Sequence, residues 1–280
     1  MNKLRLFSSL VMVAALLAGT CAVSAQQSFV ESFTAHNTSM TKLQPAMITP
    51  LMSADPRIMQ YAKFSFANSR TSSGTQTTSY GNGKGFGLIG GNRYEFDYIP
   101  PAYLQHNSSA LDGFGDMGTL VKYRIASGNA DHGNYIVTAM LGHTFSTGSH
   151  KNGATTDSYG PMLAGGYTFG HFDVISSLGG TMPTGKIAAQ GRAIGWNNVL
   201  QMHATKHVWL EVESNSSFYF SGSHDGKVQN FVTPAAFYVV RRKEWKPTHP
   251  YLIIDGGMQI ATSSYHSYSH NAISEMRVIF

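Results

Sequence analysis

Charged residues recur at every second position in several apolar segments of this chain. Ten of them form the candidate functional set: Arg93, Glu95, Asp97, Lys122, Arg124, Glu211, Glu213, Asp255, Glu275 and Arg277. Successive side chains of a β-strand point to opposite faces, so these charges would share one face of their strands. Mixed signs at this density predict ion pairs across neighbouring strands, because unpaired buried charges are costly. The set could form a selectivity filter or a packed interior that only stabilises the protein.

Twelve histidines raise the question of a metal site or a hydrolase. A histidine can activate a nearby serine hydroxyl, and the candidate pairs lie in His106-Asn107-Ser108 and in His266-Ser267-Tyr268-Ser269-His270. Both pairs fall in predicted loops, which favours solvated histidines over a catalytic pair. His203 and His207 are separated by a predicted tight turn rather than placed on one helix face, which argues against a metal. We predict no catalytic residue, no metal and no cofactor.

Glycine occupies every second position from Gly81 to Gly87, which leaves one face of a predicted strand without side chains. Such a strand indicates a bend or a close approach by another segment. One interpretation is a weak point for lateral exit of an apolar substrate. The other is a tightly curved strand, which we favour.

The N-terminus has the pattern of an export signal. Lys3 and Arg5 precede a short apolar run, and Val23-Ser24-Ala25 supplies the small residues that a signal peptidase needs. We therefore expect residues 1–25 to be a signal peptide cleaved before Gln26. Cleavage removes the single cysteine, so the mature chain would contain neither disulfides nor thiolates.

The composition suits a protein with one lipid-facing surface. Charged residues make up 12% of the chain, about half the usual share, while aromatic residues make up 12% and glycine occurs 29 times. The formal net charge of +5 falls to +3 without Lys3 and Arg5, which is too weak a bias to predict nucleic-acid binding.

Twelve strands are expected after residue 56. Their predicted ranges are 59–68, 77–88, 92–98, 116–126, 134–145, 158–169, 171–181, 193–203, 207–217, 227–240, 251–262 and 271–280. The connections alternate between short and long, as periplasmic turns and external loops do in bacterial outer-membrane barrels. On this pattern Tyr103 and His150 lie in external loops and Trp245 in a periplasmic turn. Residues 26–56 contain three prolines and would form a periplasmic arm, a plug inside the barrel or a disordered leader.

The last predicted strand has one apolar face and one charged face. In residues 271–280, Met276, Val278 and Phe280 share one face, while Glu275 and Arg277 share the other. An apolar strand that ends on an aromatic residue is typical of the closing strand of an outer-membrane barrel, and Phe280 would serve as its assembly signal. The alternative is the last strand of a soluble periplasmic sandwich.

A short motif resembles a known family. Residues 113–118, Gly-Phe-Gly-Asp-Met-Gly, followed by Lys122-Tyr123-Arg124, resemble the barrel proteins of the MetA-pathway of phenol degradation family. The predicted strands from Tyr80 to Phe280 fit that family's layout, whereas residues 26–56 lie outside the match. The resemblance implies a barrel that passes small hydrophobic compounds, and it supplies no catalytic residue.

We therefore predict an all-β protein, a transmembrane antiparallel up-and-down barrel of about twelve strands with periplasmic termini. The barrel would occupy residues 57–280 and reside in the outer membrane of a Gram-negative type of cell envelope. Its partners would be outer-membrane lipid, the barrel assembly machinery and a small hydrophobic or aromatic substrate taken up passively. A structural or surface-interaction barrel without conductance and a membrane-embedded lipid hydrolase are the alternatives.

Overall fold

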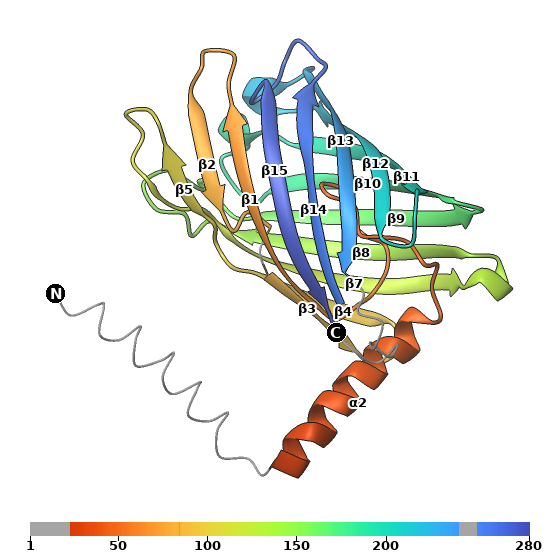
Figure 1. Ribbon diagram of the computed structural model, residues 1–280. Coiled ribbons are helices and arrows are strands. Elements are labelled where there is room, and N and C mark those ends of the chain that lie inside the picture. The colour runs from red at the N-terminus through yellow and green to blue at the C-terminus, as the bar shows by residue number, and fades with distance from the viewer. Residues whose placement is uncertain (1–22, 84, 241–250) are drawn as a thin grey trace.

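The computed structural model describes residues 23–83, 85–240 and 251–280. Its strands form one antiparallel sheet, and pairing of the first strand with the last closes that sheet into a barrel (Figure 1). Two of the twelve wall strands are each broken into two pieces, and one further two-residue strand is added, which gives fifteen strand segments. The predicted fold class and strand number are confirmed.

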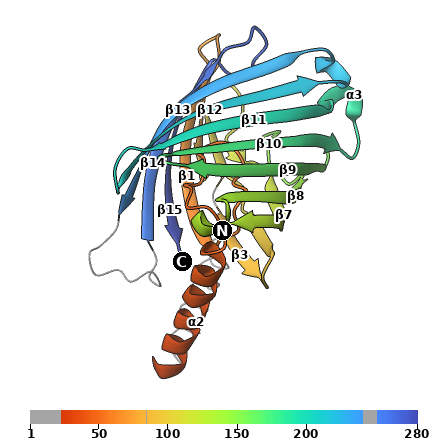
Figure 2. The same cartoon turned by 90° about the vertical axis from the view of Figure 1, so that its right-hand side faces the viewer.

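The strand bounds agree with the predicted ranges to within a few residues over most of the wall. The segments are β1 (Tyr61–Arg70), β2 (Gln76–Tyr80), β3 (Gly85–Gly90), β4 (Tyr94–Ile99), β5 (Tyr103–His106), β6 (Gly113–Phe114), β7 (Met117–Gly128), β8 (Tyr135–Phe145), β9 (Ser158–Phe169), β10 (Phe172–Pro183), β11 (Ala193–His203), β12 (Val208–Tyr219), β13 (Val228–Val240), β14 (Tyr251–Ala261) and β15 (His270–Ile279). Short turns join strands at one end of the barrel and longer loops at the other, here called the short-turn end and the long-loop end (Figure 2).

The strand expected over residues 77–88 is interrupted, because the chain turns at Gly81 and Gly83 with φ of 79° and 69°. Few side chains tolerate such angles, so the glycines permit a break between β2 and β3. The lateral-exit and curvature interpretations of these glycines both remain predictions.

A second break separates β4 from β5, where Pro100 and Pro101 cannot donate to a ladder. The chain then pairs again, with Tyr103 opposite Tyr80. Our placement of Tyr103 in an external loop is therefore wrong.

One stretch of wall is completed by a loop instead of a strand. Near the long-loop end, β5 pairs with β2 and β6, whereas β7 pairs with β8. The loop of residues 146–157 bridges these two groups, since the Ser149 amide donates to the Phe114 carbonyl at 2.8 Å. The Asp116 carboxylate holds the same loop by accepting from the amides of Gly148 at 2.8 Å and Ala154 at 2.6 Å. His150 lies in this loop.

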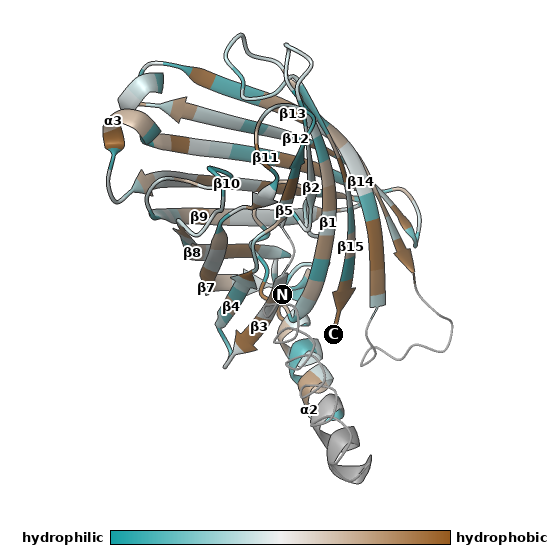
Figure 3. Ribbon diagram, turned by 90° about the vertical axis from the view of Figure 1, so that its left-hand side faces the viewer, coloured by the Kyte–Doolittle hydropathy of each residue, from teal (hydrophilic) through white to brown (hydrophobic). Residues whose placement is uncertain are grey.

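Hydropathy alternates along the strands of the wall (Figure 3), and the exposed fractions of neighbouring residues place the apolar side chains outside and the charged ones inside. Val212 is 51% exposed, whereas its neighbours Glu211 and Glu213 are buried. Met276 is likewise 51% exposed beside buried Glu275 and Arg277. This polarity is the reverse of a soluble sheet and is that of a barrel surrounded by lipid.

Residues before β1 form two parts. Helix α2 (Val23–Thr41) extends from the short-turn end, beside the end of β15 (Figures 1 and 2). Residues 44–60, here called the inner segment, then run inside the barrel without regular secondary structure. None of the helices in the described residues is long and apolar enough to cross a membrane. Residues 1–22 of the predicted signal peptide and the turn with Trp245 lie outside the described residues.

Candidate functional site: the occupied lumen

The inner segment needs partners for its backbone. Pro45, Pro50 and Pro56 interrupt both helix and strand, so its amides and carbonyls cannot satisfy one another. Most of the segment is nevertheless buried, including Ile48 and Leu51. Buried backbone groups without hydrogen bonds are costly, and the lumen must therefore supply donors and acceptors.

Carboxylates of the wall accept from the amides of the inner segment. Glu213 on β12 accepts from Met52 at 2.6 Å and from Ser53 at 2.8 Å. Glu211 on the same strand accepts from the Leu51 amide at 3.1 Å. Glu95 on β4 accepts from the Met59 amide. Three of the predicted lumen residues therefore bind the inner segment directly.

Cationic and amide side chains bind its carbonyls. Arg277 on β15 donates to Thr49 at 2.6 Å and to Pro50 at 3.1 Å. Lys122 on β7 donates to the Arg57 carbonyl at 3.3 Å. Gln201 donates to the Ile48 carbonyl at 2.9 Å, and Thr138 donates to the Pro56 carbonyl. Wall side chains thus supply the backbone of this segment with hydrogen-bond partners, as a neighbouring strand does in a sheet.

Ion pairs connect several of the same wall residues. Lys122 lies 2.7 Å from Glu95 and 4.0 Å from Asp97. Arg277 pairs with Glu275, and it lies 3.3 Å from Asp255. The cations therefore neutralise wall carboxylates and hold the inner segment at the same time.

The two remaining predicted residues lie near the short-turn end. Arg124 donates to the Met40 carbonyl at 3.3 Å and to the Asn92 carbonyl at 2.6 Å, which anchors the end of α2. Arg93 precedes β4 and is exposed, with its guanidinium 3.4 Å from the Tyr123 hydroxyl. The prediction that Arg93 lines the lumen is therefore wrong, because the strand begins one residue later and Arg93 belongs to the turn.

An ion pair forms within the inner segment itself. Arg57 lies 2.6 Å from Asp55, and the Thr49 hydroxyl donates to the same carboxylate at 2.6 Å. Burial acts to raise the pKa of Asp55, but the charge and hydrogen bonds of Arg57 outweigh burial and lower that pKa to about 2. The pair is therefore ionised at neutral pH.

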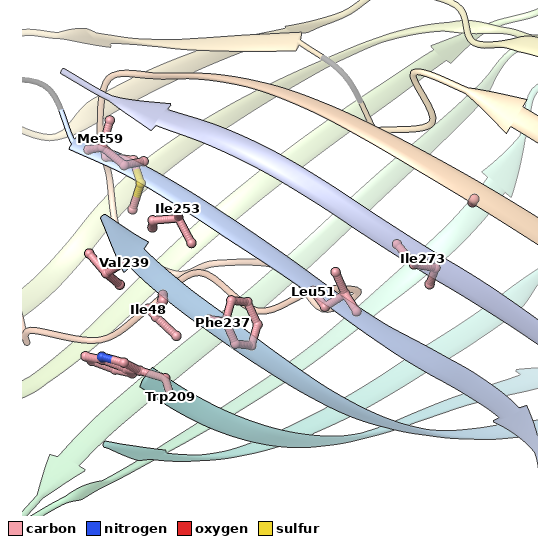
Figure 4. Close-up of a cluster of buried hydrophobic side chains, with 10 residues drawn as sticks. Ile48, Leu51, Met59, Trp209, Phe237, Val239, Ile253 and Ile273 are labelled. Atoms are coloured by element: carbon pink, nitrogen blue, oxygen red, sulfur yellow. The ribbon is translucent and has the colours of Figure 1, made fainter. Parts of the chain in front are cut away.

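Apolar side chains lie beside the charged ones on the inner face of the same part of the wall. Trp209, Phe237 and Ile253 point inward from β12, β13 and β14 and pack against Ile48 and Leu51 (Figure 4). The whole cluster of buried residues is Ile48, Leu51, Met59, Ala67, Trp209, Phe237, Val239, Ile253, Ile273 and Ile279. Sequence reasoning missed these residues, although alternation places Trp209 on the same face as Glu211.

Three cavities follow the inner segment. One of about 820 Å³ lies at the short-turn end, and one of about 290 Å³ lies against residues 49–55. A space of about 30 Å³ shares lining residues with both, and Met59 and Ile279 line all three. The three cavities therefore lie close together beside the apolar cluster.

The histidines do not form a metal site in the described residues, where no group of three or more histidine, cysteine, aspartate or glutamate side chains could hold an ion. The predicted partners Ser108 and Ser267 do not pair with the histidines beside them. His106 contacts Asn152 and Thr77, and His266 lies 3.0 Å from the Ser72 hydroxyl. Sequence reasoning missed that Ser72 contact, which joins two loops 194 residues apart.

Comparisons with known proteins bear on the fold. No family model matches the sequence, and no curated protein matches it. The structure is similar to a NanC porin, with a TM-score of 0.51 and 10% identity over 79% of this chain and 98% of the porin. The chain has the fold of an outer-membrane β-barrel. OmpT, an outer membrane protein of Vibrio cholerae, aligns over 82% of this chain and 99% of its own with 9% identity, but its TM-score is 0.36.

Proposed function

We propose that the protein is an outer-membrane channel for passive uptake of small, largely apolar molecules. The apolar cluster inside the lumen is the observation that carries this proposal. The interior of a barrel that conducts water and hydrophilic solutes is polar, so a cluster with Trp209 and Phe237 favours an apolar solute. The solute would pass beside the inner segment, through the cavities that Met59 and Ile279 line.

Uptake of a labelled aromatic compound tests this function. Vesicles with an outer leaflet of lipopolysaccharide should take up radiolabelled toluene faster when they contain the protein. Ile48→Gln adds a polar group to the cluster and should slow uptake, whereas Leu43→Gln changes a 48% exposed side chain and should not. Heat-modifiable gel mobility would show that both variants fold. Equal uptake with and without the protein would contradict the proposal.

Two other functions each have one observation in their favour. The dense hydrogen bonding of the inner segment favours a barrel without conductance, and the same uptake assay separates that function from a channel. The contact of Ser72 with His266, whose other ring nitrogen lies 2.9 Å from the Ser263 carbonyl, favours a hydrolase. Labelling of Ser72 by a fluorophosphonate probe would support hydrolysis, and no labelling is expected from a channel.

A further inference from the structure

The largest cavity has the size and lining of a small-molecule site. It measures about 820 Å³, within the range of roughly 300–1,000 Å³ that ligand pockets have. Trp209, Tyr251, Met47 and Met59 give it an apolar wall. Residues at the end of α2 and in the turn between β11 and β12 form part of its lining. A flat or compact apolar group therefore has a surface against which to pack.

Cations predominate among the charged groups that line this cavity. Lys42, Arg57 and Lys206 line it, no acidic side chain does so among the described residues, and Phe280 adds one C-terminal carboxylate. Arg57 is already neutralised by Asp55 at 2.6 Å. In the described part of the chain, neither Lys42 nor Lys206 forms a salt bridge within 4.0 Å. Two lysines that form no salt bridge among the described residues therefore border the cavity.

Ordered backbone carries both lysines. Lys42 follows the last residue of α2, and its carbonyl accepts from Asn129 at 3.1 Å. Lys206 lies in the turn from β11 to β12, where the Thr205 hydroxyl accepts from the His207 amide at 3.1 Å and from the Val208 amide at 2.9 Å. The two amines thus come from separate, fixed elements that border the same opening.

We propose that this cavity binds a small amphipathic carboxylate. Its apolar body would pack against Trp209, Tyr251 and Met59, and its carboxylate would pair with Lys42 and Lys206. The proposal rests on the channel function and specifies its substrate class. Wall carboxylates such as Glu211 and Glu213 do not repel the anion here, because they do not line this cavity and the inner segment covers them.

Binding of three matched probes tests the charge requirement. The full chain in nonionic detergent would be titrated calorimetrically with benzoate, benzyl alcohol and benzylammonium. We expect saturable binding of benzoate, and binding at least about tenfold weaker for the other two, the scale of one charge-assisted contact. Benzoate should also change the fluorescence of Trp209, measured in a background that carries both Trp196→Phe and Trp245→Phe. Equal affinity for the three probes would overturn the proposal.

Two double variants locate the site. Lys42→Gln with Lys206→Gln should weaken benzoate binding about tenfold or more, while Lys151→Gln with Lys186→Gln, at the long-loop end, should leave it unchanged. Equal loss in both double variants would show general attraction of anions and overturn the site.

Uptake by vesicles separates this proposal from the channel function. If benzoate binds through Lys42 and Lys206 but the protein does not accelerate its uptake, the site stands and the channel function fails. If the protein transports benzyl alcohol and benzoate equally and binds neither preferentially, the channel function stands and this proposal fails.

Discussion

Replacing Glu213 by glutamine perturbs the contact that holds the centre of the inner segment. The Glu213 side chain is buried and accepts from the amides of Met52 at 2.6 Å and Ser53 at 2.8 Å, and from the Ser53 hydroxyl. Glutamine keeps the size of the side chain but turns one carboxylate oxygen into a donor. That donor would face another donor, so at least one amide of the inner segment loses its partner.

The expected cost follows from these contacts. A hydrogen bond to a charged group contributes about 1.5–3 kcal/mol, and a buried group left without a partner costs about 1–3 kcal/mol. We therefore expect opening of residues 51–53 to become easier by about 3 kcal/mol, which corresponds to roughly a hundredfold larger open population. Arg277 and Gln201 still hold the preceding carbonyls, so the barrel itself should persist.

Hydrogen exchange measured by mass spectrometry tests this expectation. The amides of residues 51–53 should exchange roughly a hundredfold faster in Glu213→Gln, with the wall strands unchanged. Glu31→Gln on the exposed side of α2 is the matched control and should not alter exchange of the inner segment. Unchanged protection of residues 51–53 in Glu213→Gln would refute the anchoring role of this carboxylate.

Three further predictions concern separate parts of the molecule. The Asp55 pKa is lowered from 3.8 to about 2 in the folded protein. Its pair with Arg57 should therefore stabilise the inner segment above pH 3.8 and lose that effect as the pH falls through about 2. Hydrogen-exchange rates of the inner segment, measured during an acid titration, would show this loss. Asp116→Asn should loosen the loop of residues 146–157 by about 1–3 kcal/mol and speed its cleavage by added protease, whereas an unchanged cleavage rate would contradict the bridging role. Met276→Arg should destabilise the barrel by about 2–4 kcal/mol, and Val278→Arg, nearer the rim, by about 0–1 kcal/mol, measured by urea unfolding from liposomes. A larger loss of stability in Val278→Arg than in Met276→Arg would contradict the depth in the membrane that we assign to the two residues.

Alternation along the strands was sufficient to predict the two faces of the wall. Glu211 and Glu213 alternate with Val208, Leu210 and Val212, and the structure places the two glutamates inside. The period of a strand is a local property, so it can be read without knowing the neighbouring strand. The closing strand shows the same agreement, with Glu275 and Arg277 inside and Met276 outside.

The partners of those side chains could not be predicted in the same way. Cations were expected opposite the carboxylates, yet Glu213 binds amides of residues about 160 positions earlier in the chain. The inner segment has no period, because its prolines exclude regular structure, and the sequence therefore left arm, plug and leader equally open. Backbone groups are the same in every residue, so no sequence pattern marks them as the partners of a charge.

The breaks in the wall strands could not be predicted from the sequence either. Alternating glycines indicated a bend, but the separation of β2 from β3 depends on the angles at Gly81 and Gly83. At Arg93 the predicted strand was too long instead of too short. The alternation of charged and apolar residues included Arg93, whereas the strand begins at Tyr94. Boundaries of this kind depend on which residue makes the last ladder hydrogen bond, which the side-chain pattern does not record.

Single-channel conductance with and without residues 26–56 tests the central claim that the inner segment occupies and narrows the lumen. Both proteins would be checked for a folded barrel by heat-modifiable gel mobility and then inserted into planar bilayers. We predict that deletion raises the conductance severalfold, because it removes the segment that Glu213 and Arg277 hold across the lumen. An equal conductance of the two folded barrels would contradict the claim.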